Sequence, residues 1–129
     1  IDLCSVTRIQ EAIQHHPNFK PINFSSEEIE YSNRPKNQLV QAERFAARFA
    51  AKEAVVKALG GVSEVNASFL DINILRNQTG QPYVLLLGAA QRRAQEIGVT
   101  EVFLSLAHSK KTAMAFCVTV GLHQQVAQC

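Results

Sequence analysis

The stretch of residues 39–59 is the part of the chain whose structure the sequence constrains most. It is rich in alanine, the strongest helix former, and it ends at Gly60-Gly61, a pair that stops helices. At 100° per residue one seam of this helix consists of Phe45, Phe49, Lys52, Val56 and Leu59. Beside the seam lies a strip of small residues that lets another backbone or a ligand come close: Ala46, Ala50, Ala54 and Ala58. We therefore expect a long helix to organise the fold.

Three charged residues on this helix need an explanation. Lys52 lies within the apolar seam, where an unpaired charge is costly to bury, so its ammonium group must reach solvent or a partner. Glu53 and Lys57 are four residues apart and share a neighbouring face. They are either an ordinary surface pair, worth roughly 0.2–0.5 kcal/mol, or a chemical pair. In the second case Glu53 binds a metal or accepts a proton, and Lys57 binds phosphate or transfers a proton. The helical pattern leaves both interpretations open.

The rest of the chain alternates between short strand and helix signals. We expect a strand at residues 1–6, a helix opened by a capping box of Thr7 and Gln10, and a loop at residues 17–23. A second capping box, Ser25 with Glu28, starts a short helix that ends near residues 33–35. A hairpin of residues 69–76 and 83–87, a helix at 89–97 and strands at 102–107 and 113–120 follow. This order predicts an α+β domain with a mainly antiparallel sheet packed against the long helix.

Length and composition narrow the classes of function. The 129 residues fit one domain, which we place at residues 1–129, and an apolar share of 47% supplies a core. With 13 basic and 11 acidic residues the net charge is +2, too mild for a dedicated nucleic-acid binder. The longest apolar run, residues 83–90, is less than half of the ~20 residues that a membrane-spanning helix needs. The three cysteines form no CxxC pair, and their odd number favours a reducing, cytoplasmic setting.

Four stretches agree, in order and spacing, with the motifs of one enzyme family. The first is Ile1-Asp2-Leu3 followed by Arg8-Ile9, and the second is Arg48-Phe49-Ala50-Ala51-Lys52-Glu53-Ala54-Val55-Val56-Lys57-Ala58-Leu59-Gly60. The third is Gly80-Gln81-Pro82-Tyr83, and the fourth is Ser105-Leu106-Ala107-His108 followed by Ala113-Met114-Ala115. By these motifs the chain resembles the 4′-phosphopantetheinyl transferases, and among them the short, single-domain holo-[acyl-carrier-protein] synthase branch. It departs from the family pattern at Ala107, where a second serine is common.

The resemblance implies a reaction and a set of site residues. Enzymes of this family move the 4′-phosphopantetheine arm of coenzyme A onto a serine hydroxyl of an acyl carrier protein and release adenosine 3′,5′-bisphosphate. Asp2 and Glu53 match the family's Mg²⁺ ligands, and magnesium suits a site with one or two carboxylates plus phosphate oxygens. Lys57 is expected to contact phosphate and to help the leaving group depart, and Glu53 to accept the serine proton.

The same resemblance assigns residues that bind the two substrates. Arg48 and His108 match family residues near the phosphates of coenzyme A, which makes them cofactor-binding candidates together with Lys57. Arg8 matches a position that meets the acidic carrier protein, where basic charge raises the association rate. The short branch assembles as a homotrimer with sites between subunits, so we expect Glu53 and His108 to meet across an interface. The other histidines lack such support and are expected on the surface: His15, His16 and His123.

Two other functions stay open at the level of sequence. One is an RNA-binding module in which Arg44, Arg48 and Lys52 follow the phosphates. Such modules need exposed aromatic side chains among their basic residues, whereas Phe45 and Phe49 lie on the core seam and the chain has no tryptophan. The other is a catalytically inactive scaffold that only binds the carrier protein. The presence of Asp2, Glu53 and Lys57 argues against this second alternative.

Overall fold

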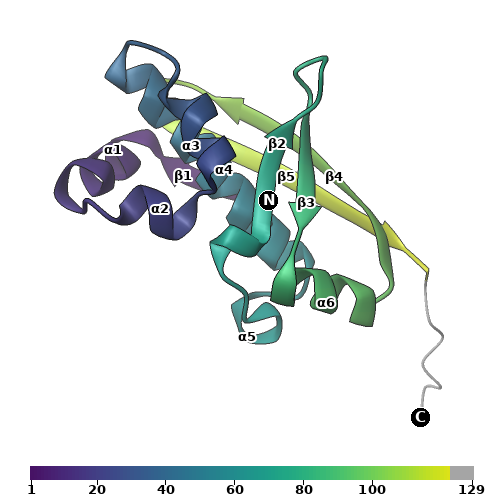
Figure 1. The fold of residues 1–129 in the computed structure, drawn as a ribbon. Coiled ribbons are helices and arrows are strands. Elements are labelled where there is room, and N and C mark those ends of the chain that lie inside the picture. Colours follow the sequence, from purple (N-terminus) through teal and green to yellow (C-terminus); the bar gives the residue numbers. More distant parts are fainter. Residues whose placement is uncertain (123–129) are drawn as a thin grey trace.

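The computed structural model describes residues 1–122, and its longest element is α4 (Gln38–Ala58), which runs through the middle of the molecule (Figure 1). The chain reaches α4 through β1 (Asp2–Ser5), α1 (Val6–His15), α2 (Phe19–Asn23) and α3 (Ser26–Asn33). After α4 come α5 (Val62–Val65), the 3-10 turn η1 (Phe69–Asp71), β2 (Ile72–Arg76), β3 (Pro82–Leu86) and α6 (Gly88–Glu96). The long strands β4 (Val99–His108) and β5 (Thr112–Gly121) complete the described part.

The strands form two antiparallel sheets. The larger has the order β1-β5-β4, and the smaller is the hairpin of β2 and β3. In the larger sheet Asp2 is opposite Ala115 and Cys4 is opposite Ala113, so the short first strand lies along β5. The predicted α+β architecture, with a mainly antiparallel sheet packed against the long helix, is confirmed.

Helix α4 packs its alanine strip against β5. Ala46, Ala50 and Ala54 are fully buried and share apolar clusters with Ala113 and Ala115 of that strand. Small side chains on both elements allow the helix backbone to come close to the sheet at interior packing density. The seam on the helix packs against the α1–α3 layer and η1, where Phe24 meets Phe45 with ring centroids 5.0 Å apart and Phe49 meets Phe69 at 5.2 Å. Helix α4 is therefore held from two sides.

Lys52 lies inside this core, with its side chain fully buried. Its Nζ donates to Oε1 of Glu28 at 2.9 Å and to the carbonyl oxygens of Phe69 and Ile72, both at 2.7 Å. The other carboxylate oxygen of Glu28 accepts the Ile74 N–H at 2.9 Å. The prediction that Lys52 needs a partner is confirmed, and the pair ties α4 to α3 and to the hairpin. A lysine held this way cannot follow RNA phosphates, so that part of the RNA-binding hypothesis is wrong.

Two predictions in the N-terminal third are wrong in detail. Helix α1 does not start after Thr7, because the hydroxyl of Ser5 accepts the Arg8 N–H at 3.3 Å and makes Ser5 the N-cap. Residues 17–23 are not all loop, since they contain α2. Pro21 lies in the first turn of α2, where a missing N–H costs no intrahelical hydrogen bond. His15 and His16 are exposed as expected, and His123 lies outside the described residues.

The predicted capping box and hairpin turn are present. Ser25 Oγ accepts the Glu28 N–H at 3.2 Å, and Glu28 Oε1 accepts the Ser25 N–H at 2.7 Å. The strand β2 starts three residues later than predicted because Phe69–Asp71 form a 3-10 turn capped by the Ser68 hydroxyl. In the β2–β3 turn Gly80 has φ +86°, a left-handed conformation that favours glycine. This turn carries one edge of the site described next.

Candidate active site

Asp2, Glu53 and Lys57 lie together where β1 passes α4. Nζ of Lys57 donates to Oδ1 of Asp2 at 2.5 Å and to the Ile1 carbonyl at 3.3 Å. The Asp2 side chain is 10% exposed and that of Lys57 is 57% exposed, so the pair spans from the edge of the core to solvent. The sequence left open an ordinary Glu53–Lys57 surface pair, but the ion pair of Lys57 goes to the first strand.

The two carboxylates of this cluster affect each other. Burial raises the pKa of Glu53 above its usual range, and Asp2 raises that pKa further through repulsion and hydrogen bonding, while Lys57 opposes both effects. A cation between the two groups would let both ionise, and a carboxylate pair open to water and phosphate is the donor set that Mg²⁺ prefers. Within residues 1–122 no three His, Cys, Asp or Glu side chains gather closely enough to hold a metal ion. The two carboxylates, which line one cavity, fit a metal that takes its other ligands from water and substrate.

A cavity of about 420 Å³ opens beside the carboxylates. Asp2, Cys4, Glu53 and Arg8 line it, over an apolar floor that includes Phe49. Burial, with the nearby carboxylates adding to it, raises the pKa of the Cys4 thiol to about 11. A thiol with that pKa stays protonated near neutral pH and is a poor nucleophile. Arg8 is exposed on α1 at the rim.

A second cavity, of about 480 Å³, gathers positive charge around the β2–β3 turn. Arg44 and Arg48 of α4, Arg76 at the end of β2 and His108 at the end of β4 all line it. We call these four residues and their cavity the cationic cleft. His108 Nδ1 also lies 4.0 Å from Oε2 of Glu43. The structure thus brings together Arg48 and His108, the two residues predicted near the phosphates of coenzyme A.

Arg48 is the most buried member of the cationic cleft, at 3% exposure. Burial lowers the pKa of its guanidinium to about 10; the neighbouring Arg76 and Arg44 act in the same direction, and Tyr31 and Glu28 oppose them. Nη1 donates to the Arg44 carbonyl at 3.3 Å, but the buried Nε has no hydrogen-bond partner in the described part of the chain. A buried donor without a partner costs about 1–3 kcal/mol, and a guanidinium is well suited to satisfy it with an anion.

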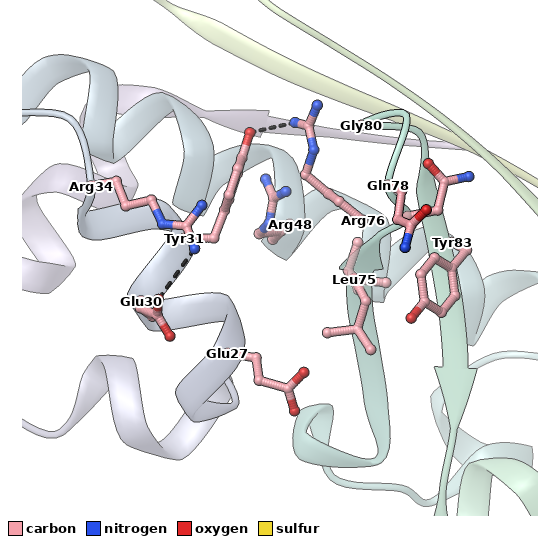
Figure 2. Close-up of a pocket in the computed structure, with 12 residues that line it drawn as sticks. Glu27, Glu30, Tyr31, Arg34, Arg48, Leu75, Arg76, Gln78, Gly80 and Tyr83 are labelled. Atoms are coloured by element: carbon pink, nitrogen blue, oxygen red, sulfur yellow. Dashed lines mark hydrogen bonds and ion pairs between the residues drawn. The ribbon is translucent and has the colours of Figure 1, made fainter.

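The cationic cleft continues into a neighbouring cavity of about 420 Å³ (Figure 2). Tyr31, Arg48, Arg76 and Gly80 line both cavities. Figure 2 shows the Tyr31 ring standing between Arg34 on one side and Arg76 and Arg48 on the other. Arg34 is already paired with Glu30 at 3.2 Å.

The carboxylate cluster and the cationic cleft are separate within one chain. The cavity beside Asp2 and Glu53 shares no lining residue with the cavity that contains Arg48 and His108. The expectation that Glu53 and His108 meet across an interface between copies of the chain stays a prediction.

Sequence reasoning missed Arg44, Arg76 and Tyr31 as parts of the cleft. The RNA-binding hypothesis names Arg44, and its position one helical turn before Arg48 places both side chains on one face of α4, which is a signal for a shared site. Arg76 ends the predicted first strand of the hairpin, directly before the turn, and this is a signal that could have found it. For Tyr31 the sequence holds no such signal.

The comparisons with known proteins agree with these motifs. The sequence model of the 4′-phosphopantetheinyl transferase superfamily matches residues 1–117. A holo-[acyl-carrier-protein] synthase of Clostridium kluyveri is 41% identical over 118 residues, which cover 92% of this chain and 85% of the relative. A synthase of Moorella thermoacetica is 40% identical over 118 residues, covering 89% and 87%.

Solved structures of such synthases share the fold. The Plasmodium yoelii acyl carrier protein synthase with ADP bound has a TM-score of 0.81 at 30% identity and covers 95% of this chain and 93% of its own. The Helicobacter pylori holo-[acyl-carrier-protein] synthase in complex with coenzyme A has a TM-score of 0.76 at 26% identity, with 92% and 96% covered.

The chain therefore belongs to the 4′-phosphopantetheinyl transferase superfamily. Within that superfamily it is an enzyme of the holo-[acyl-carrier-protein] synthase kind, as its sequence relatives are. The resemblance drawn from the four motifs is thereby confirmed. No helix of the described residues combines the length and the apolar character that crossing a membrane requires.

Proposed function

We propose that this enzyme transfers 4′-phosphopantetheine from coenzyme A to a serine of an apo acyl carrier protein, with Mg²⁺, and releases adenosine 3′,5′-bisphosphate. The observation that carries the proposal is the presence, in one fold, of a two-carboxylate cluster and a separate cleft whose arginines form no ion pair with a carboxylate of residues 1–122. The names of the relatives and the coenzyme A complex of the Helicobacter pylori synthase support the same substrates.

The carboxylate cluster is suited to the reacting pyrophosphate. Asp2 and Glu53 would hold Mg²⁺, which when bound neutralises phosphate charge. The serine oxygen forms a bond to the phosphorus that carries the pantetheine arm, and the bond from that phosphorus to the bridging oxygen breaks. Glu53 accepts the serine proton as the general base. The Lys57 ammonium, whose pKa is raised by its hydrogen bond to Asp2, stays charged and stabilises the departing bisphosphate.

The cationic cleft is suited to the other phosphate of coenzyme A. The pyrophosphate belongs with the carboxylates and Lys57, which leaves the 3′-phosphate of the adenosine as the anion for Arg48 and its neighbours. The unpartnered Nε of Arg48 and the guanidinium of Arg76 are donors for such a dianion. Arg8, exposed at the rim of the carboxylate cavity, is placed to attract the acidic carrier protein toward the metal site.

An apolar sheet face supports a homotrimer with shared sites. On the face of the larger sheet away from α4, six large side chains are 39–65% exposed: Leu3, Phe103, Met114, Phe116, Val118 and Val120. Leu3 is opposite Met114, and Phe103 is opposite Val118, so the residues form one patch across three strands. Contiguous patches of this kind mark interaction surfaces. A neighbouring copy on this patch would bring its cationic cleft to the carboxylate cluster, completing the site that one chain leaves divided.

One assay tests the transfer. The protein is incubated with apo acyl carrier protein, coenzyme A and Mg²⁺, and the intact carrier is weighed by mass spectrometry. The expected result is a gain of one phosphopantetheine group, lost in Glu53→Gln and kept in the matched surface variant Glu96→Gln. A carrier of unchanged mass with the native protein would refute the proposal, and carrier binding without transfer would identify an inactive scaffold.

Two further measurements separate the finer parts. A chelator is expected to stop the transfer and added Mg²⁺ to restore it; full activity in excess chelator would contradict the metal role. Light scattering is expected to give three times the mass of one chain. Phe116→Lys is expected to reduce that mass to one chain and to abolish transfer, whereas Gln91→Lys on α6 changes neither. A native mass of one chain would exclude the trimer.

A further inference from the structure

The cationic cleft poses a problem of stability. Arg44, Arg48 and Arg76 lie close enough that Arg76 and Arg44 depress the pKa of Arg48. Among the described residues, none of the three has a carboxylate within 4.0 Å of its guanidinium; the ion pairs of the described region involve other cations. Neighbouring guanidinium groups carry like charges and repel each other. Some other group must hold these guanidinium groups in place.

Tyr31, near the end of α3, contacts all three. Its ring centroid is 4.2 Å from the Arg44 Cζ, 4.3 Å from the Arg48 Cζ and 4.9 Å from the Arg76 Cζ, distances at which a guanidinium is attracted to an aromatic ring. Arg34 is farther away, at 5.9 Å. The residue also makes two polar contacts. The Tyr31 carbonyl accepts from Nη1 of Arg44 at 2.9 Å, and the Tyr31 hydroxyl accepts a hydrogen bond from Arg76.

These contacts connect three parts of the chain. Tyr31 belongs to α3, Arg44 and Arg48 to α4, and Arg76 to the end of β2. Figure 2 shows the Tyr31 hydroxyl directed at the Arg76 guanidinium, with Arg48 beside the ring. The hydroxyl that accepts from Arg76 keeps its own proton, so it can still donate to a further acceptor in the cleft.

We propose that Tyr31 is a positioning residue that gathers Arg44, Arg48 and Arg76 and sets their donors for the 3′-phosphate of coenzyme A. The inference rests on the proposed function, because it takes coenzyme A as the ligand of the cleft. Tyr31 acts through the arginines and takes no part in bond breaking.

The ring and the hydroxyl of Tyr31 have separable effects. Tyr31→Phe keeps the ring contacts and the backbone carbonyl but removes the acceptor for Arg76. Tyr31→Leu removes the ring as well. The first variant therefore removes one hydrogen bond to Arg76, and the second also removes the ring contacts of all three guanidinium groups. The loss of phosphate binding is expected to grow in that order.

The test compares coenzyme A with dephospho-coenzyme A, which lacks the 3′-phosphate, by titration calorimetry. Coenzyme A is expected to bind about 3–5-fold more weakly to Tyr31→Phe and about 10–30-fold more weakly to Tyr31→Leu. Dephospho-coenzyme A is expected to change less than about 2-fold in both, since it lacks the group that the arginines bind. In transfer assays KM for coenzyme A rises and kcat stays near the native value. The control is Gln91→Leu, which alters an exposed side chain of α6 outside the described cavities and changes neither affinity.

The outcomes distinguish the hypotheses. Equal losses for the two ligands would show that Tyr31 is merely structural, and unchanged binding in Tyr31→Leu would show that the arginines hold themselves; either result overturns the inference. Unfolding temperatures measured beside the titrations show whether Tyr31→Leu is folded, and Tyr31→Phe provides the answer if it is not. Native protein that fails to bind coenzyme A would instead refute the proposed function, and this inference with it.

Discussion

Lys52→Met is the substitution whose effect the structure predicts most directly. Methionine keeps the length of the aliphatic side chain and removes the ammonium group. Three hydrogen bonds disappear, at 2.9, 2.7 and 2.7 Å, and Glu28 keeps its charge inside the core without the cation that balanced it. The two hydrogen bonds that Glu28 accepts from the backbone N–H groups of Ser25 and Ile74 remain.

Breaking a buried ion pair from one side costs about 3–5 kcal/mol. The same change on the surface costs at most about 1 kcal/mol. The matched control is therefore Arg34→Met, which breaks the Arg34–Glu30 pair, whose side chains are 64% and 71% exposed. For a domain of this size 1 kcal/mol shifts the unfolding temperature by about 4 °C. We expect Lys52→Met to unfold roughly 12–20 °C below the native protein, and Arg34→Met within about 4 °C of it.

Urea and thermal unfolding at one fixed protein concentration measure both variants, because assembly makes apparent stability depend on concentration. The double variant Lys52→Met with Glu28→Gln buries neither charge, so it is expected to be less destabilised than the two single losses add up to. A Lys52→Met loss below about 1 kcal/mol, or strict additivity in the double variant, would refute the claim that this pair is a coupled element of the core.

Three other substitutions test local features. Lys57→Met removes the cation that lowers the pKa of Glu53, so that pKa is expected to rise in the metal-free protein, as measured by carboxyl-carbon NMR; an unchanged or lower value would contradict the cluster's electrostatics. Because folded Glu53 already binds its proton more tightly than the unfolded chain does, its contribution to stability becomes more favourable as the pH falls toward its folded pKa. Ser25→Ala removes the N-cap of α3 and a hydrogen bond to Asn73, so it is expected to lower the free energy of unfolding by about 1–2 kcal/mol. Its control, Ser26→Ala, is expected to leave the free energy of unfolding nearly unchanged. Gly80→Ala places a side chain at φ +86° and 2.9 Å from Nη2 of Arg76, so it should cost about 1–2 kcal/mol and weaken coenzyme A binding; full affinity would show that the turn does not set Arg76.

The sequence predicts those features whose causes are local. Alanine content and the Gly60-Gly61 stop placed α4 within one residue at each end, since propensity and chain termination act over a few residues. The first helix is a case where local signals compete: Ser5 and Thr7 both carry a capping hydroxyl, and only the register of β1 against β5 decides for Ser5. Pro21 likewise gives two competing signals, because proline interrupts a helix but is compatible with its first turn, where Pro21 lies in α2.

The candidate site was predictable to the extent that motif spacing carries it. Position in the motifs brought out Asp2, Glu53 and Lys57, and the structure indeed places them together. Partners far apart in sequence were not predictable. The seam showed that Lys52 needed a counter-charge, but Glu28 lies 24 residues away, in a helix whose docking depends on the whole core. The contact of Tyr31 with Arg76 spans 45 residues and has no local signature.

Helix α4 carries members of both clusters, Arg44 and Arg48 nearer its start and Glu53 and Lys57 nearer its end. In a closed ring with shared sites, each copy then lends its carboxylates to one neighbour and its arginines to the other. A chain with substitutions in both clusters inactivates the two sites to which it contributes, so it is expected to reduce the activity of a ring that also contains native chains. Chains damaged separately, one in Glu53 and another in Arg48, complement each other, because every mixed ring of three contains one site built from two intact halves. Activity recovered on mixing two dead variants would thus be a genetic signature of a helix that serves two sites.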